Sequence, residues 1–270
     1  MQCPLCAAGF GFEGTQPNSL KCKNGHTYDF SKKGYVNLFG GYTKITKTYD
    51  KKLFCARKTV SDLGLYAKLC ETLCEIIGSS PGSVLDAGCG CGNLSADIFY
   101  ALGRPPTFGL DLSRDGIDFA ASNFCESDLF WIVANLNNLP LSDEKFDIVT
   151  NIMAPANYLE FKRVLKPGGI LVKVLPDSSY LKELRHFIYK ENDKNEYSNK
   201  EVLENLAENM DISDIVELQY SHAVSAKNIP ALFDMTPLTQ NIGEKERLKD
   251  ELSAMGELKL TLAFKIAICR

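Results

Sequence analysis

The stretch Val84-Leu85-Asp86-Ala87-Gly88-Cys89-Gly90-Cys91-Gly92 joins a short apolar run to alternating glycines, and a helical pattern follows from Leu94. Glycine accepts positive φ and lets the backbone approach a ligand, and the N–H groups that open the next helix can bind a carboxylate or phosphate. Asn93 stands where a dinucleotide fingerprint needs its third glycine, which argues against NAD. The stretch therefore predicts a strand, a ligand-binding turn and a helix.

Strand-like and helix-like segments alternate on both sides of this turn. We expect helices over residues 65–77, 94–102, 116–124 and 158–165, and strands over residues 83–87, 107–112, 130–134, 146–152 and 170–175. This alternation is typical of a doubly wound α/β fold with a parallel sheet. Apolar residues occupy every second position of 258–268, which predicts a strand that pairs antiparallel with residues 215–226. The segment 227–256 is too long for a hairpin loop, so it should carry helix and could cover a substrate site.

Length and composition suit one large domain plus a small one, because the 270-residue chain is 45% hydrophobic. Cys3 follows Met1 almost at once, without a basic and apolar leader. No apolar run reaches the length of about 18 residues that a membrane span needs. We expect a soluble, cytoplasmic protein that does not enter a membrane and whose cysteines are reduced.

Metal-binding residues form two pairs near the start of the chain. Cys3 and Cys6 give a C-x2-C pair, and Cys22 and His26 give a C-x3-H pair. Three thiolates and one imidazole match tetrahedral zinc, which can replace a hydrophobic core in a small module. The alternative is a set of reduced thiols or a redox pair, but a redox C-x-x-C needs neither the second pair nor the histidine. We predict a structural zinc site in a module over residues 1–38.

The charge of the chain is unevenly distributed. Residues 1–60 carry ten basic and three acidic side chains, a formal charge of +7, and because the whole chain carries −4, the other 210 residues carry −11. This asymmetry predicts that the front end contacts a polyanion, and the alternative is a solvated lysine-rich surface. Residues 40–52 are polar, basic and turn-rich, so we expect a basic linker over residues 39–64 before a domain over residues 65–270.

Further motifs follow the glycine turn in order. Asp111 ends the next strand, where an acid can accept both ribose hydroxyls, and the later motifs are Val133-Ala134-Asn135, Leu139-Pro140, Phe146-Asp147-Ile148-Val149 and Leu165-Lys166-Pro167-Gly168-Gly169. The series resembles the class I S-adenosylmethionine (SAM) methyltransferase domain over residues 65–175. The resemblance implies a Rossmann-like fold with a mostly parallel seven-stranded sheet. It also implies that the turn Gly88–Gly92 holds the methionine part of SAM, Asp111 the ribose and Asn135 the adenine edge.

The combined motifs resemble the 23S ribosomal RNA guanine-N1 methyltransferases. The resemblance rests on Cys3-Pro4-Leu5-Cys6, Cys22 to His26, Tyr28-Asp29-Phe30, Lys33-Gly34-Tyr35-Val36-Asn37-Leu38, Ala56-Arg57, Gly64, Tyr66, the glycine turn, Ala154-Pro155 and Met235-Thr236-Pro237. It implies methyl transfer from SAM to N1 of a loop guanine in 23S rRNA. It implies that SAM is held by Tyr66, Asp86, Gly88, Cys89, Gly90, Asn93, Leu94, Asp111, Leu112, Ala134, Asn135 and Tyr180. Tyr180 stands where some members have histidine.

The chemistry of the acceptor sets its own requirements. Guanine N1 keeps its proton at neutral pH and lies on the pairing edge, so the base must be unpaired and lose this proton. No residue is identified as the general base, and Glu160 is more typical of an exposed helix carboxylate. Two alternatives remain: a small-molecule SAM-dependent methyltransferase, since fold does not fix function, and a non-catalytic zinc-containing RNA-binding protein. The oligomeric state also stays open, with a homodimer as one alternative.

Overall fold

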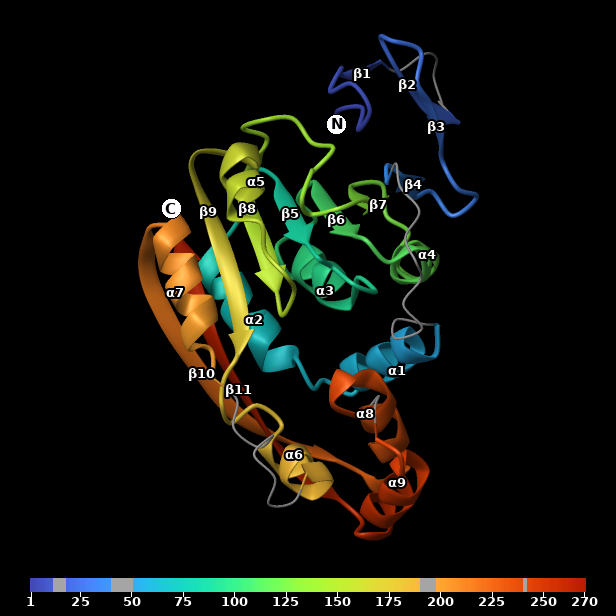
Figure 1. Cartoon of the computed structure of the whole chain (residues 1–270), viewed down its shortest axis with the longest axis vertical. Coiled ribbons are helices and arrows are strands. Elements are labelled where there is room, and N and C mark those ends of the chain that lie inside the picture. Colours follow the sequence, from blue (N-terminus) through green and yellow to red (C-terminus); the bar gives the residue numbers. More distant parts are fainter. Residues whose placement is uncertain (12–17, 40–50, 190–197, 240–241) are drawn as a thin grey trace.

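A central sheet organises the chain in a computed structural model that describes residues 1–11, 18–39, 51–189, 198–239 and 242–270. Within these residues the sheet has eight strands in the order β10-β11-β9-β8-β5-β6-β7-β4 (Figure 1). Neighbours from β9 to β4 run parallel, and β11 is antiparallel to both β9 and β10. The strands are β4 Val36–Asn37, β5 Val84–Ala87, β6 Thr107–Asp111, β7 Leu129–Val133, β8 Phe146–Ile152, β9 Leu165–Pro176, β10 Ile212–Val224 and β11 Leu258–Cys269. The predicted α/β architecture with a mostly parallel sheet is confirmed.

Helices cover both faces of this sheet. They are α1 Lys51–Asp62, α2 Ala67–Ile77, α3 Asn93–Ala101, α4 Arg114–Asn123, α5 Tyr158–Val164, α6 Lys182–Tyr189, α7 Lys200–Asn209, α8 Ile229–Met235 and α9 Lys245–Ala254. One apolar cluster joins Leu69 of α2 to Leu262 of β11, and a second joins Phe161 of α5 to Leu85 of β5. Among the residues described, none of the helices is both long and apolar enough to cross a bilayer.

The sheet has one strand more than the seven that we predicted. The additional strand is β4, which pairs in parallel with β7 and places Val36 opposite Ile132. Val36 and Leu38 are buried in the same apolar cluster as Ile132. A two-residue strand carries no periodicity that a sequence could show, and its partner lies far along the chain. The end of the N-terminal module is therefore part of the central sheet.

The rest of the N-terminal module is a small antiparallel sheet of β1 Phe10–Gly11, β2 Ser19–Cys22 and β3 Thr27–Asp29. The ring of Phe10 meets the ring of Tyr28 edge-on, with centroids 5.7 Å apart. The amide of Gln2 donates a 2.9 Å hydrogen bond to the carbonyl of Pro140 in the large domain. Leu20 is fully buried in the apolar cluster of that domain. The module thus contacts the large domain through its first residues and through β2.

The predicted linker contains a helix. Helix α1 covers residues 51–62 and buries Leu53, Phe54 and Val60, which corrects the expectation of a basic linker over residues 39–64. These apolar residues fall on one helical face, but two basic residues before them and two between them hide the pattern. Residues 40–50, with Lys44 and Lys47, lie outside the described residues.

The C-terminal half follows the prediction closely. Strands β10 and β11 pair antiparallel along most of their length, for example Tyr220 opposite Leu262, so the predicted pairing is confirmed. The segment between them carries α8 and α9, as expected from its length. In Figure 1 α8 lies beside α1, and the two helices are in contact.

Candidate cofactor pocket and zinc site

The glycine turn lies at the carboxyl end of β5. Gly88, Gly90 and Gly92 have φ values of 89°, 59° and 76°, in the left-handed region that favours glycine. A Cβ atom on Gly88 would lie 2.5 Å from Cβ of Ala154, and one on Gly92 would lie 2.5 Å from the ring of Trp131. Larger residues would therefore strain the turn and press it against its neighbours.

A cavity of about 1030 Å³ adjoins this turn. All the predicted cofactor residues except one line it: Tyr66, Asp86, Gly88, Cys89, Gly90, Asn93, Leu94, Asp111, Leu112, Asn135 and Tyr180. The exception is Ala134, which is buried in the core and whose amide donates a 3.0 Å hydrogen bond to the carbonyl of Asp111. Ala134 therefore supports the end of β6 without lining the cavity. The other residues meet in one cavity, although they are spread over more than a hundred positions of the sequence.

Two carboxylates at strand ends have different surroundings. Asp86 is almost fully buried and accepts hydrogen bonds from the hydroxyls of Ser95 and Thr150. Burial raises the pKa of Asp86 to about 6. Asp111 accepts the amides of Gly90 at 2.9 Å and Ser113 at 2.7 Å. Burial raises the pKa of Asp111 as well, and these two amides oppose the rise. Asp86 therefore joins α3 and β8 in the buried interior through Ser95 and Thr150, whereas Asp111 joins the glycine turn to the start of α4.

Tyr66 and Tyr180 meet at the cavity from distant parts of the sequence. Their hydroxyl oxygens lie 2.9 Å apart, so one hydroxyl donates to the other. The ring of Tyr180 packs against Phe264, with centroids 5.3 Å apart. Burial raises the pKa of both tyrosines, so both stay neutral. The tyrosine at position 180 thus extends the wall that Tyr66 begins.

The loop after β8 forms the wall next to the glycine turn. The Nδ2 group of Asn151 donates to the carbonyls of Ala87 at 2.6 Å and Pro155 at 3.0 Å. Nζ of Lys173 donates to Oδ1 of Asn151 and, at 2.6 Å, to the carbonyl of Ala154. Burial lowers the pKa of Lys173 to about 8. This polar network ties the loop to the end of β5, and only Ala154-Pro155 of it was part of the sequence prediction.

Arg57 of α1 also reaches the cavity, which the sequence prediction did not include. Its Nε group donates a 3.3 Å hydrogen bond to the carbonyl of Met235 in α8, and its Nη1 lies 3.5 Å from where a Cβ on Gly90 would be. The motif Ala56-Arg57 was visible in the sequence, but its place beside the glycine turn depends on α1, which was expected to be linker.

Glu160 differs from its expected setting. Its side chain is only 16% exposed, lies 2.7 Å from Arg163 and accepts the amide of Leu139. Burial opposes its ionisation, but the hydrogen bonds from Arg163 and Leu139 outweigh burial and lower the pKa of Glu160. Glu160 does not line the cavity, so it supports the fold next to Leu139.

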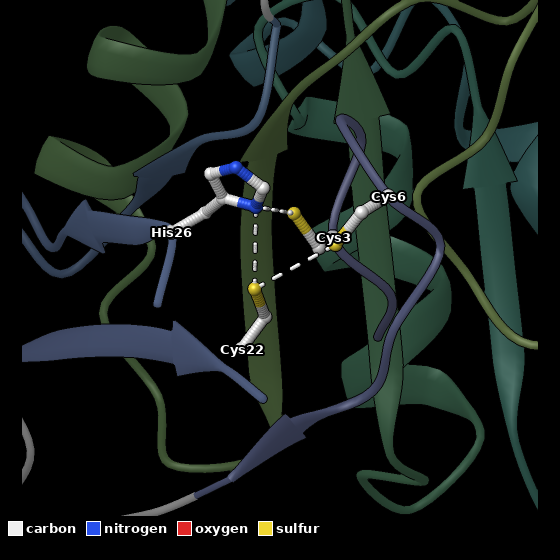
Figure 2. Close-up of side chains that lie close together, drawn as sticks. All are labelled: Cys3, Cys6, Cys22 and His26. Carbon is white, nitrogen blue, oxygen red and sulfur yellow. Dashed lines mark hydrogen bonds between the residues drawn. The ribbon is translucent and has the colours of Figure 1, made fainter. Parts of the chain in front are cut away.

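The four predicted zinc ligands converge in the N-terminal module (Figure 2). Nδ1 of His26 lies 3.5 Å from Sγ of Cys3 and 3.4 Å from Sγ of Cys22, and Sγ of Cys6 lies 3.7 Å from Sγ of Cys22. A tetrahedron with zinc–sulfur bonds of about 2.3 Å has edges of about 3.7 Å. The donor set and its spacing therefore fit a closed, structural zinc site.

Comparisons with known proteins agree with these two sites. One family model, described as a methyltransferase domain, matches residues 84–169, and a second, a zinc ribbon described as "RlmA, N-terminal", matches residues 1–47. A solved geranyl diphosphate C-methyltransferase from Streptomyces coelicolor A3(2) is 19% identical, with a TM-score of 0.47 and 76% of each chain covered.

Two curated relatives of this chain are described as 23S rRNA guanine-N1 methyltransferases. The chain is 37% identical to YxjB of Bacillus subtilis (strain 168), described as a candidate 23S rRNA (guanine-N(1)-)-methyltransferase, over 96% of this chain and 91% of that protein. It is 34% identical to the 23S rRNA (guanine(748)-N(1))-methyltransferase of Streptomyces fradiae, over 68% of this chain and 66% of that protein. The first match runs over nearly the whole length of both proteins. The chain belongs to the family of 23S rRNA guanine-N1 methyltransferases.

Proposed function

We propose that this protein transfers the methyl group of SAM to N1 of a loop guanine in 23S rRNA. The observation that carries the proposal is the 37% identity with YxjB over 96% of the chain, because it joins the zinc module and the cavity in one match. The fatty-acid O-methyltransferase of Mycolicibacterium smegmatis, by contrast, matches only 32% of this chain. The substrate is therefore inferred from the similarity of the whole chain.

The residues of the cavity fit SAM. Oδ1 of Asn93 is buried and accepts no hydrogen bond from the described residues, so it is available to a donor on a ligand. The carboxylate of Asp111 can accept ribose hydroxyls, and the exposed Leu112 offers an apolar surface to the adenine. When bound, SAM supplies a methyl group on a positively charged sulfur. The protein would hold it with the glycine turn, Asp111 and Asn135.

The acceptor base would enter from the side of the insertion. Met235, Thr236 and Leu238 line the cavity, which supports the expectation that residues 227–256 lie near the substrate. The carbonyls of Ala154 and Pro155 point to Lys173 and Asn151 inside the protein, so this wall offers the base mainly apolar contacts. Such a wall would exclude water and hold the flat base in line with the methyl group.

The zinc module over residues 1–38 would recognise RNA. Lys23 and Lys32 are exposed on it, whereas Lys33 is paired with Asp118 of α4. Exposed lysines can contact phosphates, so the module could grip an RNA loop while the base enters the cavity. Ribosomal RNA as substrate implies a cytoplasmic protein, and a homodimer remains a proposal that sedimentation velocity would test.

A methylation assay tests the proposed function. The protein is incubated with tritiated SAM and either 23S rRNA, 16S rRNA or a metabolite extract, and the label in each fraction is counted. We expect label in 23S rRNA. A methyl group on N1 blocks base pairing, so reverse transcription of the product should stop one nucleotide before a single guanine.

Two controls make the result specific. A 23S transcript with adenine in place of that guanine should lose both the label and the stop. Label in the metabolite extract alone would favour a small-molecule methyltransferase, and no label in any fraction would favour a non-catalytic RNA-binding protein.

A further inference from the structure

The cavity is rich in carboxylates. Five aspartates line it: Asp86, Asp111, Asp115, Asp118 and Asp177. The methionine part of SAM carries an ammonium group and a carboxylate. A carboxylate that enters an acidic cavity is repelled unless a cation faces it. The site therefore needs a positive group near the place that the methionine part occupies.

Three arginines supply the positive charge among the described residues of the lining: Arg57, Arg114 and Arg185. Nε of Arg114 donates to the hydroxyl of Tyr35 at 3.4 Å, and its charge acts on Asp115 and Asp118. Arg185 is 7% exposed and donates to the carbonyl of Ser178, in the loop after β9. These contacts direct Arg114 toward Tyr35 and Arg185 toward the loop after β9.

Arg57 is the arginine beside the turn. Its Nη1 would lie 3.5 Å from a Cβ on Gly90, and its charge favours the ionised form of Asp111. Two contacts hold the side chain in place: the guanidinium carbon lies 5.9 Å from the ring centroid of Phe54, and Nε donates to the carbonyl of Met235 at 3.3 Å. A planar guanidinium held in this way can bind a carboxylate through parallel N–H groups.

We propose that Arg57 binds the α-carboxylate of the methionine part of SAM. The inference rests on the proposed function, because it requires SAM in the cavity. It assigns a role in cofactor binding to α1, a helix outside the residues that match the methyltransferase domain model. Because the same guanidinium holds the carbonyl of Met235, the bound carboxylate would also tie α1 to α8 at the side where the acceptor base enters.

Calorimetry with two cofactors tests this assignment without any measurement of activity. The full-length protein and Arg57→Met are titrated with SAM and with decarboxylated SAM, which lacks only the carboxylate. We expect Arg57→Met to bind SAM about 10- to 100-fold more weakly, which is the loss of one charged hydrogen-bonded pair. It should bind decarboxylated SAM as tightly as the wild type or more tightly, because a repelling cation has been removed. Retained binding of decarboxylated SAM also proves that the variant is folded.

Arg114→Met is the matched control, because it removes an arginine from another wall of the same cavity. It should change the affinities for both cofactors by the same factor. If Arg57→Met lost affinity for both cofactors equally, or for neither, the carboxylate would belong to the amides at the start of α3 and the proposal would be overturned. Failure of the wild type to bind SAM at all would instead contradict the proposed function, and with it this inference.

Discussion

Asp111 joins the glycine turn to the start of α4 at the wall of the cavity, and a single substitution can test its role there. Its two oxygens accept the amides of Gly90 and Ser113, and in the proposed function the same carboxylate accepts the ribose hydroxyls. Asp111→Asn keeps the shape but loses the charge and one acceptor. We expect SAM binding to weaken by about 1.5–3 kcal/mol. Calorimetry checks this, and unchanged affinity in a variant with the wild-type melting temperature would refute the ribose assignment.

Lys173 gives a prediction about pH. Its pKa falls from 10.5 in the unfolded chain to about 8 in the folded protein, because burial disfavours the charge. Between these values the unfolded chain binds more protons, so this residue makes the folded state more stable as pH rises. Lys173→Met has no such titration. The free energy of unfolding of the wild type, relative to that of the variant, should therefore grow by about 2 kcal/mol between pH 7 and 9.5.

Denaturant titrations of both proteins at the two pH values supply the measurement. Other groups titrate equally in both proteins and cancel in the difference. A difference that stays constant with pH would show that Lys173 keeps its ordinary pKa in the folded protein.

The residues of the cavity could be predicted where they belong to a sequence motif, and could not be predicted where only the fold brings them together. Asp111 and the glycines follow from the strand–turn–helix pattern, and their spacing is local in sequence. Arg57 and Lys173 lie in segments whose neighbours only the fold provides, so no spacing indicates that they reach the cavity or support it. Ala134 differs from the other motif residues, because its side chain packs into the core.

The zinc module is the element whose stability depends on one ion. Its β1–β3 sheet is short, and Cys3, Cys6, Cys22 and His26 join the segments that such a small sheet cannot hold. We expect one zinc per chain in the wild type and none in Cys22→Ser, because three ligands make a far weaker site. Metal analysis of protein purified without added zinc measures both. Cys125→Ser, an exposed thiol elsewhere, is the control and should keep its zinc.

Equal zinc contents in wild type and Cys22→Ser would remove this site. Loss of zinc should also release the module from the large domain, so the peptide bonds of residues 1–38 should become more sensitive to protease than those of Cys125→Ser.

Helices and strands with a clear hydrophobic periodicity could be predicted from the sequence, and those that depend on contacts with distant residues could not. The alternation of apolar and polar residues in β11 and the length of the segment before it predicted the C-terminal hairpin and its helices. The strand β4 has two residues, and the apolar residues of α1 are interrupted by Arg57 and Lys58, so both elements became visible only in the folded chain. Their partners, β7 and α8, lie about 100 and 180 residues further on.

The uneven charge of the whole molecule leads to a prediction about salt. Lys23, Lys32 and Lys51 are exposed in the basic front end. Replacing all three by Gln should weaken RNA binding and flatten the dependence of log Kd on log salt by up to about 2–3 units of slope. SAM affinity should not change, because these side chains do not line the cavity.

Filter binding at several salt concentrations measures both quantities. The matched control replaces Lys182, Lys200 and Lys259, three exposed lysines in the acidic part of the chain, and should leave affinity and slope nearly unchanged. If the two triple variants behaved alike, the front end would be a solvated surface and the small-molecule alternative would gain weight.

The pairing of β4 with β7 also orders events during synthesis. The four zinc ligands are complete once His26 has left the ribosome, but Val36 must wait for Ile132, and Gln2 must wait for Pro140. At about 5–20 residues per second, the nearly 100 residues between Val36 and Ile132 take about 5–20 s to make. During this interval the nascent chain presents a finished metal site without the sheet edge that later receives it. The zinc site is thus the first of these native contacts that the growing chain can complete, and the contacts of Gln2 and Val36 with the large domain follow.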